Sequence, residues 1–194
     1  GESPARILEH YASLTGRAPV PPKWTLGTWL SSCGTHRTQE EVQTLVSGLE
    51  RRELPADVIH IYTWWMRGRK YCDFQWDRKA FPKPEVLIEV LHRLGLKLSL
   101  WEHPYISVES ELYAVGKGKG YFIRRPDGEV YTIDYGLSLA PKPDGRVRRA
   151  SGKDSWNARV AVVDFTNPEA TDWFKDLHRP LLRRGGDVCT PAVG

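Results

Sequence analysis

The stretch "VIHIYTWWM", residues 58–66, indicates the fold class of this chain. It begins with mostly β-branched residues, which favour a buried strand, and it then places large or polar side chains in a row: Tyr62, Thr63, Trp64 and Trp65. Helical patterns precede and follow this strand. An apolar strand between two helices is typical of a parallel α/β sheet, whose ligands bind at the carboxyl ends of the strands.

The two flanking helices have recognisable ends. Residues 38–54 carry apolar side chains at helical spacing, and Thr38 with Glu41 three positions later predicts a capping box at the start. Residues 84–95 show the same spacing and end at Gly95, which is typical of a helix C-terminus. Both helices are therefore expected to cover the sheet.

The rest of the chain continues the alternation. Residues 107–160 are predicted to be irregular, with a hairpin at "RRPDGEVYTI", and the proline-rich stretch 18–24 cannot lie in a central strand. Strands alternating with helices predict parallel strands joined by right-handed crossovers. The predicted strands are 25–32, 58–65, 96–106 and 160–165, with the start of another at 186–188; a third helix covers 167–185, with Pro168 at its first position.

The predicted strands end in chemically suggestive residues. These ends are 31–33, 62–65 and 101–105, and the carboxyl ends of parallel strands meet at one edge of the sheet. Tyr62, Trp64 and Trp101 are therefore expected to face a shared pocket, suited to sugar rings or other flat ligands. The alternative is that these aromatic side chains only close the end of the core.

Composition excludes several classes of protein. The 194 residues can bury one sizeable core, the net charge of +4 is mild, and no apolar run approaches the roughly 20 residues of a membrane helix. The cysteines are Cys33, Cys72 and Cys189; their odd number and the absence of a CxxC pair argue against a disulfide framework and favour a cytoplasmic protein. The only methionine is Met66, so Gly1 is not expected to be a native start.

Other motifs are weak. Glu102–His103 lacks a second histidine at metal-ligand spacing, and His60 between two isoleucines is expected to be a satisfied core residue. "VGKGKGYF" (115–122) has the wrong context for a phosphate loop, and no Ser/His/Asp set has the context of a nucleophile. We expect no metal, no cofactor and no nucleic-acid partner. The basic residues Arg146, Arg148, Arg149 and Lys153 are expected to form a solvated loop.

Three stretches together resemble a known family. "YASLTGRAPVPPKWTLGTWLS" (11–31), "YCDFQWDRKAFPKPEVLIEVLHRLGLKLSLWEHPYIS" (71–107) and "VVDFTNPEATDWF" (162–174) are similar to the catalytic barrel of glycoside hydrolase family 31, most closely its bacterial α-xylosidases. The resemblance implies a partial (β/α)8 TIM barrel: the first three βα units plus the start of a fourth. Residues 1–23 are then a lead-in segment and 24–194 the N-terminal half of the barrel.

The resemblance also implies an activity. The family hydrolyses α-glycosidic bonds with retention, which requires two carboxyl groups only about 5–5.5 Å apart. Its nucleophile follows the fourth strand in a Lys-Thr-Asp-Phe-Gly-Glu motif, whereas this chain has "GGDVCTPAVG" (185–194). Asp187 matches the opening of that strand and is expected at the opposite edge from the active site. The nucleophile and the acid/base are thus expected beyond the chain end, and no catalytic residue within it.

The resemblance assigns substrate contacts, with departures. Trp101 matches the family's tryptophan that contacts the sugar, and Tyr62, Thr63 and Trp64 would line the same subsite. Tyr62 stands where the family usually has an aspartate that holds sugar hydroxyls. Thr63–Trp64 replaces Cys-Phe of the α-xylosidases, and Gly34 replaces a Phe. An α-xyloside or α-glucoside is the expected substrate; the alternative is a non-catalytic carbohydrate-binding or degenerate fragment that lacks the nucleophile and the acid/base. In either case the chain is expected to self-associate through open sheet edges.

Overall fold

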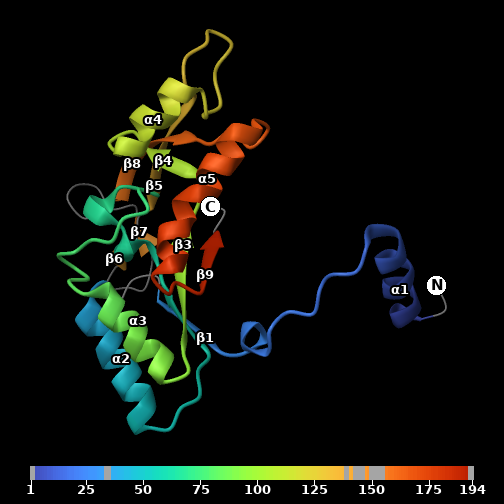
Figure 1. Ribbon diagram of the computed structural model, residues 1–194, viewed down its shortest axis with the longest axis vertical. Coiled ribbons are helices and arrows are strands. Elements are labelled where there is room, and N and C mark those ends of the chain that lie inside the picture. Colours follow the sequence, from blue (N-terminus) through green and yellow to red (C-terminus); the bar gives the residue numbers. More distant parts are fainter. Residues whose placement is uncertain (1–2, 33–35, 138–139, 142–146, 149–155, 192–194) are drawn as a thin grey trace.

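The computed structural model describes residues 3–32, 36–137, 140–141, 147–148 and 156–191. Its centre is a sheet of four parallel strands in the order β1-β2-β3-β9 (Figure 1). The four strands follow one another across the sheet in their order along the chain, which is the arrangement of a barrel that has not closed. The strands are β1 (Trp29–Ser32), β2 (Val58–Ile61), β3 (Lys97–Glu102) and β9 (Val188–Pro191).

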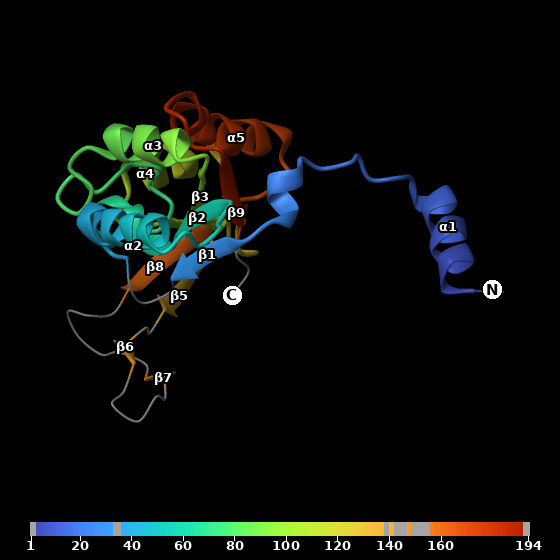
Figure 2. The same ribbon diagram turned by 90° about the horizontal axis from the view of Figure 1, so that it is seen from below.

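Three helices connect these strands and lie on the same side of the sheet (Figure 2). The predicted partial α/β barrel, with three βα units and the start of a fourth, is therefore confirmed. The crossover helices are α2 (Gln39–Arg51), α3 (Pro84–Arg93) and α5 (Pro168–Arg183).

The sequence signals at the helix starts act as expected. The Thr38 hydroxyl accepts a hydrogen bond from the backbone N–H of Glu41, and the Glu41 carboxylate accepts one from the Thr38 N–H, so the capping box is present. At α5, the Asn167 side chain accepts from the Glu169 N–H, and Pro168 occupies the first turn, where its missing N–H has no consequence.

The predicted strands 25–32, 58–65 and 96–106 are longer than the observed ones. Lys23–Leu26 forms a short 3₁₀ helix (η1), so the first strand starts only at Trp29. The second strand ends at Ile61, and Thr63–Trp65 forms a second 3₁₀ turn (η2), with a third at Arg67–Arg69 (η3). Pro104 divides the predicted strand 96–106 into β3 and β4 (Tyr105–Ser107), because proline cannot donate to a sheet.

The prediction that residues 107–160 are irregular is wrong for much of that range, which belongs to a segment inserted between β3 and α5. The segment contains α4 (Glu111–Lys119) and an antiparallel sheet in the order β4-β8-β5, with β5 at Thr132–Leu137 and β8 at Trp156–Val162. Two further short strands pair with each other, β6 (Ala140–Pro141) and β7 (Val147–Arg148). The basic-loop residues Arg146, Arg149 and Lys153 lie outside the described residues.

Glycine explains why α4 is hard to detect from the sequence. Glycine weakens a helical pattern, yet Gly116 is required by packing: a Cβ there would lie 2.5 Å from the ring of Phe122. The hairpin in the same segment is confirmed, because Arg125 and Glu129 are hydrogen-bonded across a turn that contains Gly128 at φ +86°.

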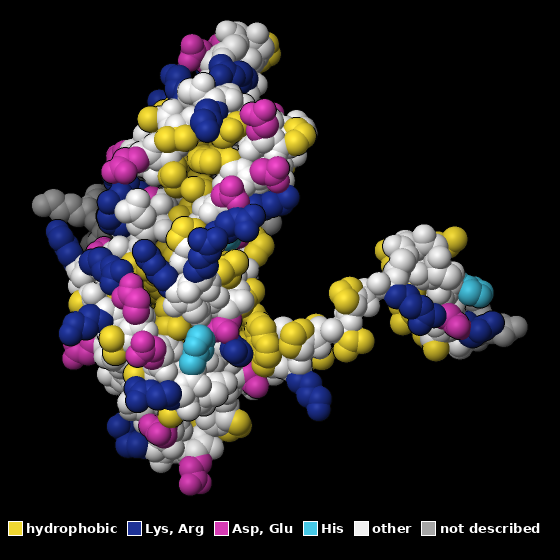
Figure 3. All heavy atoms as spheres, viewed as in Figure 1, with side chains coloured by type: hydrophobic (Ala, Val, Ile, Leu, Met, Phe, Trp, Pro, Cys, Tyr) yellow, Lys and Arg dark blue, Asp and Glu magenta, His cyan; other side chains and the backbone are white. Residues whose placement is uncertain are grey.

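The lead-in segment contains one helix that stands apart from the sheet. Helix α1 (Pro4–Thr15), capped by the Ser3 side chain, has no buried residue and lies clear of the other elements (Figures 1 and 2). Figure 3 shows hydrophobic side chains on this helix and on the segment that leads to it. Leu14 and Val20 are 87% and 96% exposed.

The amino edge of the sheet is held by a carboxylate. Asp187, immediately before β9, accepts hydrogen bonds through Oδ2 from the Leu98 N–H at 2.9 Å and lies 2.8 Å from Nε2 of His92. Its Oδ1 is 3.0 Å from Nζ of Lys97. These partners belong to α3 and the start of β3, so Asp187 lies at the edge opposite the strand ends, as predicted.

Replacing this carboxylate is expected to weaken the sheet. Burial alone would raise the pKa of Asp187, but the hydrogen bonds from Leu98, His92 and Lys97 outweigh it and lower the pKa. A lowered pKa stabilises the fold above the ordinary value, and this contribution is lost as pH falls through the folded-state pKa. Asp187→Asn should lower the free energy of unfolding at pH 7 by about 1–3 kcal/mol, and by less near pH 3.

Denaturant melts at the two pH values measure this difference. Asp172→Asn is the matched control, because the Asp172 side chain is 76% exposed and pairs across one helical turn with Lys175. A loss for Asp187→Asn that is no larger than the control's, or that does not shrink in acid, would contradict the prediction.

Candidate functional site

The carboxyl ends of β2 and β3 bring aromatic side chains together, as the sequence predicted. The ring centroids of Tyr62 and Trp101 are 5.3 Å apart. The two strands are parallel neighbours, with Ile61 opposite Leu100, so the residues that follow them reach the same edge. Such pairs are stabilised beyond the area that they bury.

A short turn orients the residues after β2. Trp65, in η2, donates a hydrogen bond from Nε1 to the backbone oxygen of Trp101 at 2.9 Å, which ties the turn to the end of β3. Thr63 and Trp65 are buried by this turn, while Trp64 stays half-buried. The guanidinium carbon of Arg37 lies 4.3 Å from the centroid of the Trp64 ring, a cation–π contact from the segment after β1.

Trp101 is more deeply buried than Tyr62 and Trp64. Its side chain is 1% exposed, with the rings of Tyr62, Tyr71 and His103 against it, the last at a centroid distance of 4.6 Å. Nε1 of Trp101 and Oγ1 of Thr63 are buried with no hydrogen-bond partner in the described part of the chain. A sugar can stack on Trp101 only if a covering ring moves.

His103 is a neutral, fully buried member of the cluster. The backbone N–H of Tyr105 donates to Nδ1 at 3.3 Å, so the ring proton is on Nε2, and this atom is buried without a partner among the described residues. Burial lowers the pKa of His103 to about 4. The thiol of Cys72 donates to the His103 carbonyl at 2.9 Å, and burial raises the pKa of this thiol well above its ordinary value. At neutral pH both groups are therefore uncharged.

The candidate residues thus occupy one edge but differ in access. Tyr62 and Trp64 are half-buried, whereas Thr63 and Trp101 are fully buried. His60 is buried as expected, and burial lowers its pKa, but the expectation that it is satisfied is wrong because its Nε2 has no partner in the described structure. Cys33 and Gly34 lie outside the described residues.

Sequence reasoning missed several members of this cluster. Tyr71 follows β2 in the long loop, and Tyr135 lies on β5; their rings are 5.2 Å apart, and Tyr135 is 5.0 Å from His103. Tyr71 is the first residue of the "YCDF" stretch that carries the family resemblance, which is a usable signal. Tyr135 offers none, because only the folding of the inserted sheet brings it here.

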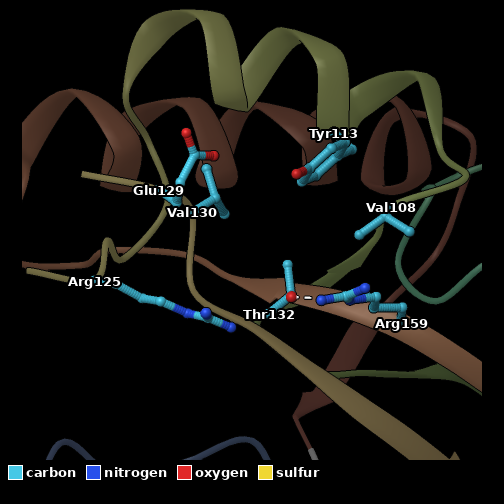
Figure 4. A pocket seen from close by; sticks show the side chains of 7 residues that line it. All are labelled: Val108, Tyr113, Arg125, Glu129, Val130, Thr132 and Arg159. Atoms are coloured by element: carbon cyan, nitrogen blue, oxygen red, sulfur yellow. Dashed lines mark hydrogen bonds between the residues drawn. The ribbon is translucent and has the colours of Figure 1, made fainter. Parts of the chain in front are cut away.

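A separate pocket of about 330 Å³ lies within the inserted segment (Figure 4). None of its lining residues comes from the ends of the four parallel strands. Within it, Arg159 donates from Nε to Oγ1 of Thr132 at 3.0 Å. The lining residues are Val108, Tyr113, Arg125, Glu129, Val130, Thr132 and Arg159.

Comparison with known proteins identifies the family. Residues 18–189 match the model described as "Glycosyl hydrolases family 31 TIM-barrel domain". The chain belongs to glycoside hydrolase family 31. Among curated relatives, an α-xylosidase of Lactiplantibacillus pentosus is 34% identical over 96% of this chain, and an α-xylosidase of Emericella nidulans is 35% identical over 97%. The chain spans about 22% of the length of each of these relatives.

Solved structures of family 31 proteins have the same fold. A dextranase of Flavobacterium johnsoniae, in a complex with isomaltotriose, superposes with a TM-score of 0.79 at 24% identity, covering 97% of this chain and 21% of its own. An α-xylosidase from a soil metagenome, in a complex with xylose, gives 0.73 at 23% identity, covering 98% and 25%. Among the residues described, no helix has both the length and the apolar character needed to cross a membrane.

Proposed function

We propose that this chain is part of the catalytic barrel of a retaining α-glycosidase that hydrolyses O-glycosyl bonds of an α-xyloside or α-glucoside. The observation that carries the proposal is the group of aromatic residues Tyr62, Trp64 and Trp101 at the carboxyl edge of a family 31 sheet. Aromatic rings beside a few hydrogen-bonding groups suit the flat, hydroxylated shape of a sugar. The two curated relatives that are 34% and 35% identical to this chain are α-xylosidases, and an α-glucosidase of Bacillus thermoamyloliquefaciens is 30% identical.

The proposed subsite has two layers. Tyr62 and Trp64 contact the sugar directly, because they are the half-buried members. Thr63 and Trp101 form the floor of the subsite. Their Oγ1 and Nε1, which have no partner among the described residues, are the groups that a sugar hydroxyl could satisfy once Tyr62 shifts. Burial of polar atoms without partners is unfavourable, so a ligand that pairs with them gains affinity.

A chimaera tests the proposal. Residues 18–189 of this chain would replace the matching segment of the L. pentosus α-xylosidase, whose remaining barrel completes the fold. Hydrolysis of an aryl α-xyloside or α-glucoside is expected, and Tyr62→Asp should raise kcat/KM about tenfold or more, because a carboxylate binds hydroxyls more strongly than a phenol.

Tyr131→Asp is the matched control for this change. Tyr131 is 42% exposed and precedes β5, outside the aromatic edge, so its replacement should leave kcat/KM unchanged. A folded chimaera that is inactive with either residue at position 62 would favour the alternative, a non-catalytic carbohydrate-binding or degenerate fragment.

We also propose that the chain self-associates. β1 and β9 are the outer strands of the parallel sheet, and each pairs on one side only in the described structure. Unpaired strand edges favour association with another chain.

A cytoplasmic location remains a prediction from the odd number of cysteines.

A further inference from the structure

A second cluster of reactive side chains lies on the face of the sheet that α5 covers, opposite the face that carries Trp101. It joins Glu102 at the end of β3, His178 on α5 and Cys189 on β9. One ligand atom from each residue lies within 4.8 Å of the other two. Figures 1 and 2 show α5 beside β9, which brings these distant parts of the chain together.

The alternation of side chains separates this cluster from the sugar site. Ser99 and Trp101 point to one face of β3, where the Ser99 hydroxyl lies 2.6 Å from that of Thr190. Glu102 points to the other face, toward α5. Cys189 precedes Thr190 and therefore also points toward α5. The cluster is consequently independent of the proposed substrate contacts.

The hydrogen bonds of His178 orient one nitrogen toward the cluster. Nδ1 lies 2.8 Å from the carbonyl oxygen of Phe174, which can only accept, so Nδ1 carries a proton. Nε2 lies 2.5 Å from Oε2 of Glu102, so a second proton lies between these atoms, and a cation can replace it only when the two atoms separate. A histidine that binds a metal through one ring nitrogen usually donates the N–H of the other nitrogen to a backbone carbonyl, a carboxylate or water, which fixes the orientation of the ring.

The surroundings favour a closed site. Glu102 is 7% exposed, and the rings of Phe74 and Phe174 lie 4.8 and 5.1 Å from His178. An apolar shell limits water and strengthens the attraction between a cation and an ionised ligand. The Cys189 thiol is half-buried, so an ion can reach it.

We propose that Glu102, His178 and Cys189 bind a zinc ion, which clamps α5 to the ends of β3 and β9. Carboxylate, imidazole and thiolate are ligands of tetrahedral Zn²⁺, and three of them leave one position for water. Zinc replaces the proton between Glu102 and His178 and displaces the thiol proton of Cys189. The 2.5 Å contact must open to about 3.3 Å, the ligand spacing of a tetrahedral site.

Cobalt titration of the full 194-residue chain tests the site. After treatment with a chelator, one equivalent of Co²⁺ is expected to produce tetrahedral d–d bands together with a thiolate-to-cobalt charge-transfer band. Zn²⁺ should abolish both bands by competition and raise the melting temperature. Cys189→Ser should remove the charge-transfer band, and His178→Gln should weaken Co²⁺ binding at least about tenfold.

Two controls make the result specific. Cys72→Ser changes a cysteine outside the cluster, whose thiol is hydrogen-bonded to the His103 carbonyl. His92→Gln changes a histidine outside the cluster, which is hydrogen-bonded to Asp187. Neither variant should alter the bands. Circular dichroism checks that each variant is folded. No thiolate band in the unmodified chain, or a band that survives Cys189→Ser and disappears in Cys72→Ser, would overturn the proposal. The site does not depend on glycosidase activity, so its failure leaves the proposed function untouched.

Discussion

Incubated with aryl α-xylosides or α-glucosides, the 194-residue chain is expected to release the aglycone no faster than a buffer blank. Retention requires one carboxylate to attack the anomeric carbon and one acid to protonate the leaving oxygen, at about 5–5.5 Å from each other. Enzymes accelerate such reactions by about a million-fold or more, so the difference from an active family member is large.

Three described carboxylates near the sheet already have hydrogen-bond or ionic partners outside the proposed sugar site. Glu102 faces His178 behind β3, and Asp187 is held at the amino edge. Of these three carboxyl groups, Asp73 in the loop after β2 has the pKa that best suits an acid catalyst, because burial raises it to about 6. Its Oδ1 nevertheless accepts from the Gln75 N–H, and its Oδ2 lies 3.4 Å from Nε of Arg67.

The assay needs chromatographically pure protein over a range of pH, with the active chimaera as the positive control. Turnover that co-purifies with the chain and exceeds the blank would contradict the prediction. The variant Asp73→Asn then decides the source: loss of that turnover would make Asp73 the acid, whereas unchanged turnover would identify a contaminating glycosidase.

Truncating Trp101 is expected to have the largest effect on stability. Its ring is 1% exposed and contacts Tyr62, Tyr71 and His103. Trp101→Ala removes these contacts and leaves a cavity, which should lower the free energy of unfolding by about 3–5 kcal/mol. Domains of this kind have a total stability of about 5–15 kcal/mol, so the variant should be close to unfolding at 25 °C.

Two matched variants distinguish packing from hydrogen bonding. Trp101→Phe keeps most of the ring and removes the buried Nε1, which has no partner in the described structure, so its loss should be much smaller than that of Trp101→Ala. Trp64→Ala truncates a half-buried tryptophan and should also lose less. Urea denaturation followed by circular dichroism measures all three. An alanine variant at position 101 within about 1 kcal/mol of the original chain would refute the burial argument.

Local signals in the sequence predicted the elements of the parallel sheet. The capping box of Thr38 and Glu41 and the proline at position 168 act within one helical turn, so no distant contact is needed to recognise them. The β-branched run of β2 is buried on both faces, and such strands keep a continuous apolar pattern that survives without an alignment. The ends of the predicted parallel strands indicated the aromatic edge, and the family resemblance then predicted the barrel.

The sequence by itself therefore determined the alternation of strand and helix, the edge at which Tyr62 and Trp101 meet, and the position of Asp187 at the opposite edge. Only the tertiary structure decided how deeply each aromatic ring is buried and which ring covers another. It also brought His178 to Glu102, 76 positions earlier in the chain, and placed Cys189 beside them. The physical reason is that burial and side-chain contact depend on how helices and inserted segments pack against the sheet, whereas capping and strand patterns are set by neighbours along the chain.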